Sequence, residues 1–164
     1  MPVDPASSLA VSSAAFAPVL MPVQAVLFLF LLVAVSVCDL KQREIPDGLQ
    51  LAIAALTLLC FSPVNLWGVL GALPYLVIAL FFGGSDGMGG GDIKLAAATG
   101  VVLGLPASLT ASILGLGLMS VVCGLITGKQ RLRGQKEKAA YPAGPFLAVG
   151  AAAAYFMKIG GLIL

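Results

Sequence analysis

Apolar residues fill almost the whole chain, and this feature restricts its fold more than any other. Of the 164 residues, 60% are hydrophobic and only 10% are charged, and the mean hydropathy is +1.07. Soluble domains of this size do not carry so much apolar surface, whereas apolar runs of about 20 residues can cross a bilayer as helices. Strand-like alternation, which would favour a β-barrel, is absent. The sequence therefore predicts an all-α integral membrane protein, a polytopic bundle without a sizeable extramembrane domain.

Prolines, glycines and polar runs divide the apolar sequence into about six predicted transmembrane helices. Residues 93–126 are too long for one crossing, and Gly104-Leu105-Pro106 is expected to split them. The predicted helices begin at Pro18 or Pro22 and reach about Cys38, and then cover 48–61, 67–82, 93–103, 107–126 and 141–164. Residues 1–17 are expected to form a tail before the first helix, within a single membrane domain of residues 1–164.

The positions of the cationic residues predict the topology. Eight of the nine Lys and Arg residues lie in the run 39–47, at Lys94, or in the run 128–140. Cytoplasmic loops carry the excess of Lys and Arg, so all three places are expected to face the cytoplasm. Six helices satisfy this if both termini, including the tail, lie on the non-cytoplasmic side. Residues 128–140 then form a basic cytoplasmic loop.

Several kinds of catalytic chemistry can be set aside from composition alone. The chain has no histidine, which removes Ser-His and Cys-His catalysis and the HExxH zinc proteases. Its three cysteines, Cys38, Cys60 and Cys123, are far apart and form no CxxC pair. They predict neither a disulfide framework nor a zinc site, and we expect neither a metal nor a cofactor.

Two acidic residues are expected to meet at the cytoplasmic face. Asp39 ends the first predicted helix, and Asp92 begins the fourth, directly after a glycine-rich loop. Two neighbouring carboxyl groups cannot both ionise cheaply, so they share a proton. The ionised acid can then take a proton from water, and the protonated acid can donate one to a scissile carbonyl. This pattern predicts a catalytic pair for peptide hydrolysis.

Residues around the pair are expected to shape the site. Gly89 and Gly91 would let a substrate strand lie against the loop. Lys94 and Arg43 could hold the local field positive or meet an acidic residue of the substrate. Pro46 suits the start of the second helix beside them.

Simpler interpretations of single residues remain open. Asp92 alone could be a helix N-cap, and Asp39 alone an ordinary charge at a helix end. Asp47 and Asp86 are interpreted as solvated loop or capping residues, although Asp86 is a rival partner for the pair. Gly144 is interpreted, with the proline after it, as shaping and packing the last helix.

Three segments of the chain, in order, resemble the prepilin peptidase family. Asp39-Leu-Lys-Gln-Arg-Glu-Ile-Pro-Asp47 is similar to its D-x-x-x-R-x-I-P-N segment, and Gly89-Gly-Gly91-Asp92-Ile-Lys94-Leu is similar to its G-x-G-D-x-K-L segment. Tyr141-Pro-Ala-Gly-Pro-Phe-Leu-Ala-Val-Gly150 is similar to its P-x-G-P-F/Y-x-x-x-G helix. The resemblance implies an aspartic endopeptidase that cleaves the leader of prepilin or pseudopilin proteins at the cytoplasmic face of the bacterial inner membrane. It also implies that the two acids, Asp39 and Asp92, are catalytic.

Two departures from the family pattern affect what the resemblance implies. Asp47 stands where the family usually has Asn, which adds a carboxylate near the site. These 164 residues also lack the cytoplasmic insert with paired cysteines of the long members, which methylate the new N-terminus as well. The chain resembles the short, peptidase-only members of tight-adherence (Flp-type) pilus systems, so N-methyltransferase activity is not implied. The expected partners are a prepilin with a basic leader and the lipid bilayer, without nucleic acid.

Other classes of membrane protein share some of these features. A transporter can combine interrupted helices with acids in the membrane, although here both acids fall at one face and no inverted repeat is visible. A non-catalytic membrane subunit of a pilus or secretion system is a second alternative. Proteases of the presenilin type share G-x-G-D, but their Tyr-Asp and Pro-Ala-Leu segments are not found at the corresponding places.

Overall fold

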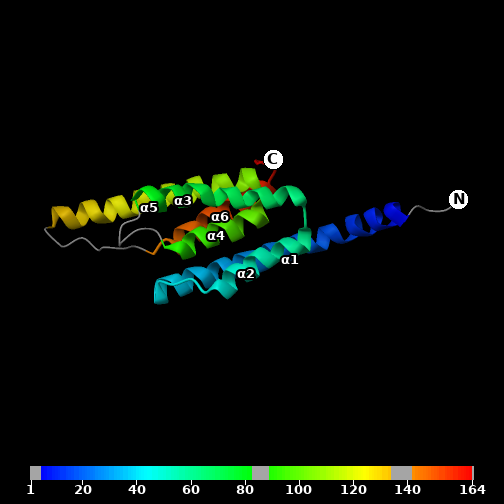
Figure 1. Ribbon diagram of the computed structural model, residues 1–164, viewed down its shortest axis with the longest axis horizontal. Helices are drawn as coiled ribbons and strands as arrows, with labels where there is room; N and C mark the ends of the chain where they lie inside the picture. The colour runs from blue at the N-terminus through cyan, green and yellow to red at the C-terminus, as the bar shows by residue number, and fades with distance from the viewer. Residues whose placement is uncertain (1–4, 83–88, 134–141, 164) are drawn as a thin grey trace.

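Helices make up the bundle seen in the computed structural model, which describes residues 5–82, 89–133 and 142–163 (Figure 1). In these ranges there is no strand, which confirms the all-α class. The elements are α1 (Pro5–Gln42), α2 (Asp47–Ala55), η1 (Leu56–Cys60), η2 (Pro63–Ala72), α3 (Leu73–Phe82), α4 (Gly90–Leu103), α5 (Leu105–Leu132) and α6 (Gly144–Ile159).

The elements combine into the six apolar segments that the sequence predicts. The 3₁₀ helix η1 continues α2, and the 3₁₀ helix η2 leads into α3. Three helices within the described residues are long and apolar enough to span a membrane: Leu20–Gln42, Pro63–Phe81 and Leu105–Leu132. The segments Asp47–Cys60 and Gly144–Ile159 are apolar but shorter. The predicted division at Gly104 is confirmed, because this residue has φ +81° and separates α4 from α5.

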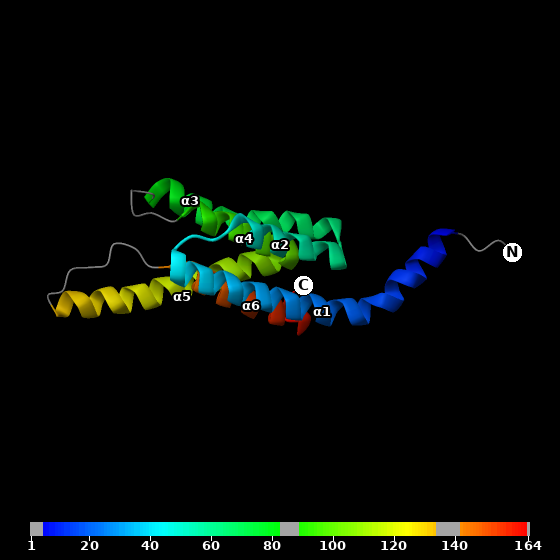
Figure 2. The same cartoon turned by 90° about the horizontal axis from the view of Figure 1, so that it is seen from below.

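Two helices are longer than predicted. α1 begins at Pro5, so residues 5–17 of the predicted tail are helical. Its candidate membrane span, Leu20–Gln42, nevertheless starts where the sequence predicts, near Pro18 and Pro22. Prolines can bend a helix without ending it, and Figure 2 shows α1 bent in its blue N-terminal part. α5 continues beyond 126 to Leu132, because cations favour the last turn of a helix and this turn contains basic residues. Residues 134–141, which include most of the predicted basic loop 128–140, lie outside the described residues.

Small residues bring α4 into the middle of the bundle. Gly68 of η2 and Gly100 of α4 are so close that a Cβ on either would collide with the backbone of the other. A Cβ on Gly150 of α6 would likewise lie 2.8 Å from the backbone nitrogen of Gly115 in α5. Close approach at small residues is a usual way to pack membrane helices. It leaves α4 in contact with α2, η2, α5 and α6.

The helices run up and down, so alternate ends meet. The C-terminal ends of α1, α3 and α5 lie at one end of the bundle, on the left in Figures 1 and 2. The N-terminal ends of α2, α4 and α6 lie at the same end. We call it the site end, because Asp39 in the last turns of α1 and Asp92 in the first turn of α4 both belong to it.

Candidate active site

A cavity of about 590 Å³ opens at the site end of the bundle. It lies between the end of α1, the link to α2, and the first turn of α4. Seven of its lining residues are those predicted for the site: Asp39, Arg43, Pro46, Gly89, Gly91, Asp92 and Lys94. The other lining residues are Gln42, Glu44, Ile45, Asp47 and Gly90. Asp86, the rival partner, lies outside the described residues.

Asp39 is almost completely buried at the edge of this cavity, with 5% of its surface exposed. The backbone N–H of Gly144 donates a hydrogen bond of 2.8 Å to its Oδ2. Gly144 begins α6, and the N-terminus of a helix favours a negative charge. A Cβ on Gly144 would lie 2.8 Å from Asp39 Oδ2 and 2.9 Å from its Cβ. Glycine is therefore required for α6 to approach Asp39 this closely.

Asp92 lies in different surroundings, in the first turn of α4. It precedes Ile93, where the predicted transmembrane segment begins, and its backbone N–H donates to the Gly89 carbonyl over 3.0 Å. The pKa of Asp92 is raised from 3.8 to about 6, mainly by burial and then by the negative charge of Asp39, while a backbone hydrogen bond at Gly89 acts to lower it. Asp92 is therefore the acid that holds a proton more readily than an ordinary carboxyl group.

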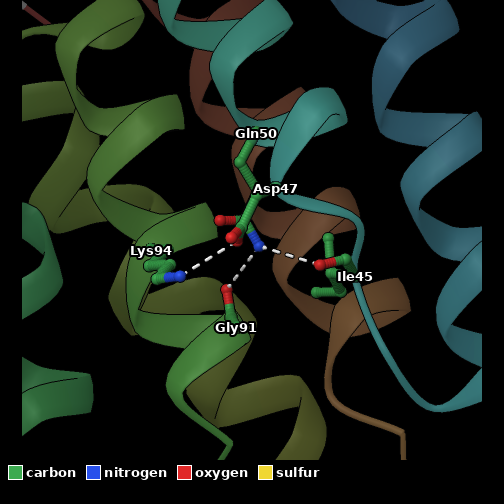
Figure 3. A network of polar contacts seen from close by, with 5 residues as sticks. All are labelled: Ile45, Asp47, Gln50, Gly91 and Lys94. Atoms are coloured by element: carbon green, nitrogen blue, oxygen red, sulfur yellow. Dashed lines mark hydrogen bonds and ion pairs between the residues drawn. The ribbon is translucent and has the colours of Figure 1, made fainter.

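The start of α2 is tied to the first turn of α4 by polar contacts (Figure 3). Lys94 Nζ donates to Asp47 Oδ1 over 2.9 Å, and both side chains are mostly exposed. Gln50, on the next turn of α2, donates from Nε2 to the Gly91 carbonyl over 3.2 Å and to the Ile45 carbonyl over 3.4 Å. Lys94 therefore has an acidic partner within the chain, where the sequence suggested one in the substrate.

Arg43 shapes the cavity through its backbone. Its backbone has a φ of 54°, a left-handed conformation that residues other than glycine adopt at a cost in energy. Its N–H donates to the Asp39 carbonyl over 2.9 Å, which closes the end of α1. The chain then turns toward α2, where the Pro46 carbonyl accepts hydrogen bonds from the N–H groups of Leu49 and Gln50.

Two residues at this site have a contact that sequence reasoning missed. Gly144 was assigned to packing alone, and Gln50 was not singled out. Gly144 could have been suspected, because proline after it marks a helix start whose free N–H groups need acceptors. The sequence gives a weaker signal for Gln50. It is a polar residue in an apolar helix, but only the fold shows that its side of α2 is buried.

Comparisons with known proteins identify a family that most of the chain matches. Residues 26–128, which include both acids, match the type IV leader peptidase family. The chain is 35% identical over 141 residues to a "Prepilin leader peptidase/N-methyltransferase" of Burkholderia pseudomallei (strain 1026b), covering 76% of the chain and 43% of that protein. It is also 35% identical over 144 residues to the protein of the same name from Bacillus subtilis (strain 168), covering 80% of the chain and 54% of that protein. The chain thus spans about half the length of the curated relatives it matches. No solved structure matches it significantly.

Proposed function

This chain belongs to the type IV leader peptidase family, and we propose that it is a membrane-embedded aspartic endopeptidase that removes the leader from prepilin or pseudopilin proteins. The observation that carries the proposal is that Asp39 and Asp92 line one cavity at one end of the bundle. Their surroundings differ in the direction that an acid and a base require. Membership of this family does not favour the two alternative functions, a transporter or a non-catalytic subunit.

The proposed reaction uses the two carboxyl groups in opposite protonation states. Ionised Asp39 takes a proton from a water molecule as the water oxygen attacks the carbonyl carbon of the scissile peptide bond. Protonated Asp92 gives its proton to the carbonyl oxygen as negative charge develops there. When the carbon–nitrogen bond breaks, Asp39 passes its proton to the leaving nitrogen, and Asp92 takes back a proton from the hydroxyl that becomes the new carboxyl group.

The position of the cavity supports a substrate that is half in the membrane. A prepilin with a basic leader and one apolar helix would leave its helix in lipid and extend the cleavage junction along Gly89 and Gly91. Lys129, Arg131 and Arg133 end α5 at the site end, which supports a cytoplasmic site at the bacterial inner membrane. A tight-adherence (Flp-type) pilus system is the setting that the short family members suggest. We propose cleavage alone for these residues, without methyl transfer.

Cleavage of a prepilin by the purified protein tests this function. Asp39→Asn and Asp92→Asn should each lower the rate by about 10²- to 10⁴-fold, the usual contribution of a general acid or base. Each variant should still insert and accumulate, as measured by immunoblot of membranes and by thermal denaturation in detergent. Glu44→Gln, which neutralises another acid lining the cavity, is the matched control and should retain activity.

Two results would reject the proposal. Retained cleavage in either Asn variant would show that the two acids are not a catalytic pair. Loss of activity in Glu44→Gln to the same extent would show that the reaction needs charge at the cavity in general and not these two acids. The mass of the new N-terminus, measured after incubation with S-adenosylmethionine, should show no added methyl group.

A further inference from the structure

Gln50 is a polar residue on a buried face of α2, with only 5% of its surface exposed. Its amide group lies between two segments that are far apart in the sequence. One is the link after α1, which follows Asp39, and the other is the first turn of α4, which contains Asp92. The two hydrogen bonds from Nε2 reach the Ile45 carbonyl in the first segment and the Gly91 carbonyl in the second.

Gly91 lies at contact distance from both Ile45 and the amide group of Gln50. A Cβ built on Gly91 would lie 3.7 Å from Ile45 Cβ and 3.8 Å from Gln50 Nε2, which is ordinary contact distance. The two segments therefore lie against each other, and the amide bridges them where they meet. A buried carbonyl that loses its donor carries a desolvation cost, so the segments would move to find another donor.

We propose that Gln50 is a positioning residue for the acid pair: its amide fixes the segment after Asp39 against the turn that carries Asp92, and so sets the separation of the two carboxyl groups. This inference rests on the proposed peptidase function. Gln50 does not line the cavity, so it acts through the backbone of its two partners and does not touch the substrate. Catalysis by two groups is sensitive to displacements of about 1 Å, so loosening this contact should affect turnover more than binding.

The chain offers a matched control in Gln24. This residue is also buried, with 7% of its surface exposed, and its Nε2 donates to the Leu56 carbonyl over 3.0 Å. It ties α1 to η1, away from the residues that line the cavity. Gln24→Leu and Gln50→Leu therefore remove the same chemical group from similarly buried positions, and only the second affects the segments of the acid pair.

The first measurement is prepilin cleavage across a range of pH. Gln50→Leu should lower kcat by about tenfold or more and leave KM within about threefold, because the substrate contacts are unchanged. The fall of activity at high pH should begin at a lower pH, because separated carboxyl groups share a proton less strongly. The charged groups that face the cavity are unchanged in this variant: Asp39, Arg43, Glu44, Asp47, Asp92 and Lys94. Gln24→Leu should keep the wild-type kcat and pH profile while losing similar thermal stability.

Gln50→Asn provides a second variant in case leucine prevents folding. It keeps an amide but is too short to reach both carbonyls, so it should show the same loss of kcat. The inference is overturned if both Gln50 variants keep wild-type kcat and pH profile, or if Gln24→Leu loses as much kcat as they do.

A second measurement does not depend on cleavage. Spin labels on Glu44→Cys and Gly90→Cys, with the three native cysteines replaced, report the distance between the two segments. A Cβ at Gly90 meets nothing within 4 Å, so a label fits there. The distance distribution should widen in both Gln50 variants and stay narrow in Gln24→Leu. If the distance distribution is unchanged in the Gln50 variants, the inference is overturned. If the distribution widens but the wild-type protein cleaves no prepilin, the proposed function is rejected and the positioning contact still stands.

Discussion

Asp39 and Asp92 line the same cavity but meet different partners. Asp39 accepts a hydrogen bond from the first N–H of α6, and a helix N-terminus stabilises negative charge. Asp92 is half-buried, with the charge of Asp39 as a second influence on its protonation. These different contacts support the proposal in which Asp39 acts as the base and Asp92 as the acid, a reaction that requires neither a metal nor a histidine.

The pKa of Asp92 predicts how the rate depends on pH. Its raised value of about 6 means that the protonated form is lost as the pH rises through that region. If Asp92 is the general acid, kcat/KM should fall above about pH 6, by up to about tenfold per pH unit. The measurement is prepilin cleavage by wild type between about pH 5 and pH 8. A rate that rises steadily through this range would show that Asp92 works in its ionised form. Asp92 would then be the base and Asp39 the acid.

The same shift has a consequence for stability. A carboxyl group whose pKa is higher in the folded state stabilises the fold when it is protonated, and this contribution is lost as the pH rises through about 6. Asp92→Asn, which cannot ionise, should therefore weaken the loss of thermal stability between about pH 4 and pH 6.

Among the elements, α6 is the one whose docking most directly affects Asp39. Its N-terminus approaches α1 through Gly144, and Lys158 near its other end donates to the Leu103 carbonyl at the end of α4. A cation at the C-terminus of a helix satisfies free carbonyl groups there. α6 therefore connects the helix that carries one acid with the helix that carries the other.

Gly144→Ala tests the docking of α6 on α1. The added Cβ would lie within 3 Å of Asp39 Oδ2, so either α6 or the carboxylate must move and the hydrogen bond is weakened. We expect prepilin cleavage to fall by about tenfold to a hundredfold. The matched control is Gly124→Ala in α5, where a Cβ meets nothing within 4 Å; it should keep full activity and equal or slightly higher thermal stability. Equal activity of the two variants would contradict the role given to Gly144.

The limits of sequence reasoning are clearest at these contacts. Asp39 and Asp92 could be singled out because a charge at the edge of an apolar segment is unusual wherever the chain folds. Gln50 and Gly91 are 41 residues apart, and Gly144 and Asp39 are 105 apart. Such contacts depend on which helix faces pack together, and nothing local in the sequence specifies that. The sequence treats residues 5–17 as a tail for a related reason, since a proline marks a possible helix end but tertiary context decides whether the helix continues.

At the scale of the whole molecule, the helices differ in length, and this bears on how deep the site lies. α4 has 14 residues, about 21 Å of helix, and α6 has 16, about 24 Å. Both are shorter than the hydrocarbon core of about 30 Å, whereas α5 with 28 residues is longer. α2, α4 and α6 all begin at the site end, and α5 continues beyond them there, so their N-termini are expected to lie at the boundary between the apolar core and the headgroups. The acid pair would then meet the substrate at the junction between its polar leader and its apolar helix.

The cavity also favours one of two possible membrane topologies of this chain. Only three helices in the described part of the chain are long enough to span by length and composition. If they alone crossed, the end of α1 and the start of α4 would lie on opposite sides of the membrane. Asp39 and Asp92 line one cavity, which favours a topology in which the two segments between them, α2–η1 and η2–α3, cross in opposite directions. We therefore predict that the short helices cross as well.

Labelling of single cysteines from outside the cell distinguishes these two topologies. In a background without the native cysteines, Glu44→Cys and Arg133→Cys should react with a membrane-impermeant thiol reagent only after the membrane is opened. Ser62→Cys, between η1 and η2, should react in intact spheroplasts, because α2–η1 has carried the chain to the outer side. Protection of Ser62→Cys together with Glu44→Cys would mean that α2–η1 does not cross. The two acids would then be separated by the bilayer, and a shared catalytic site would be impossible.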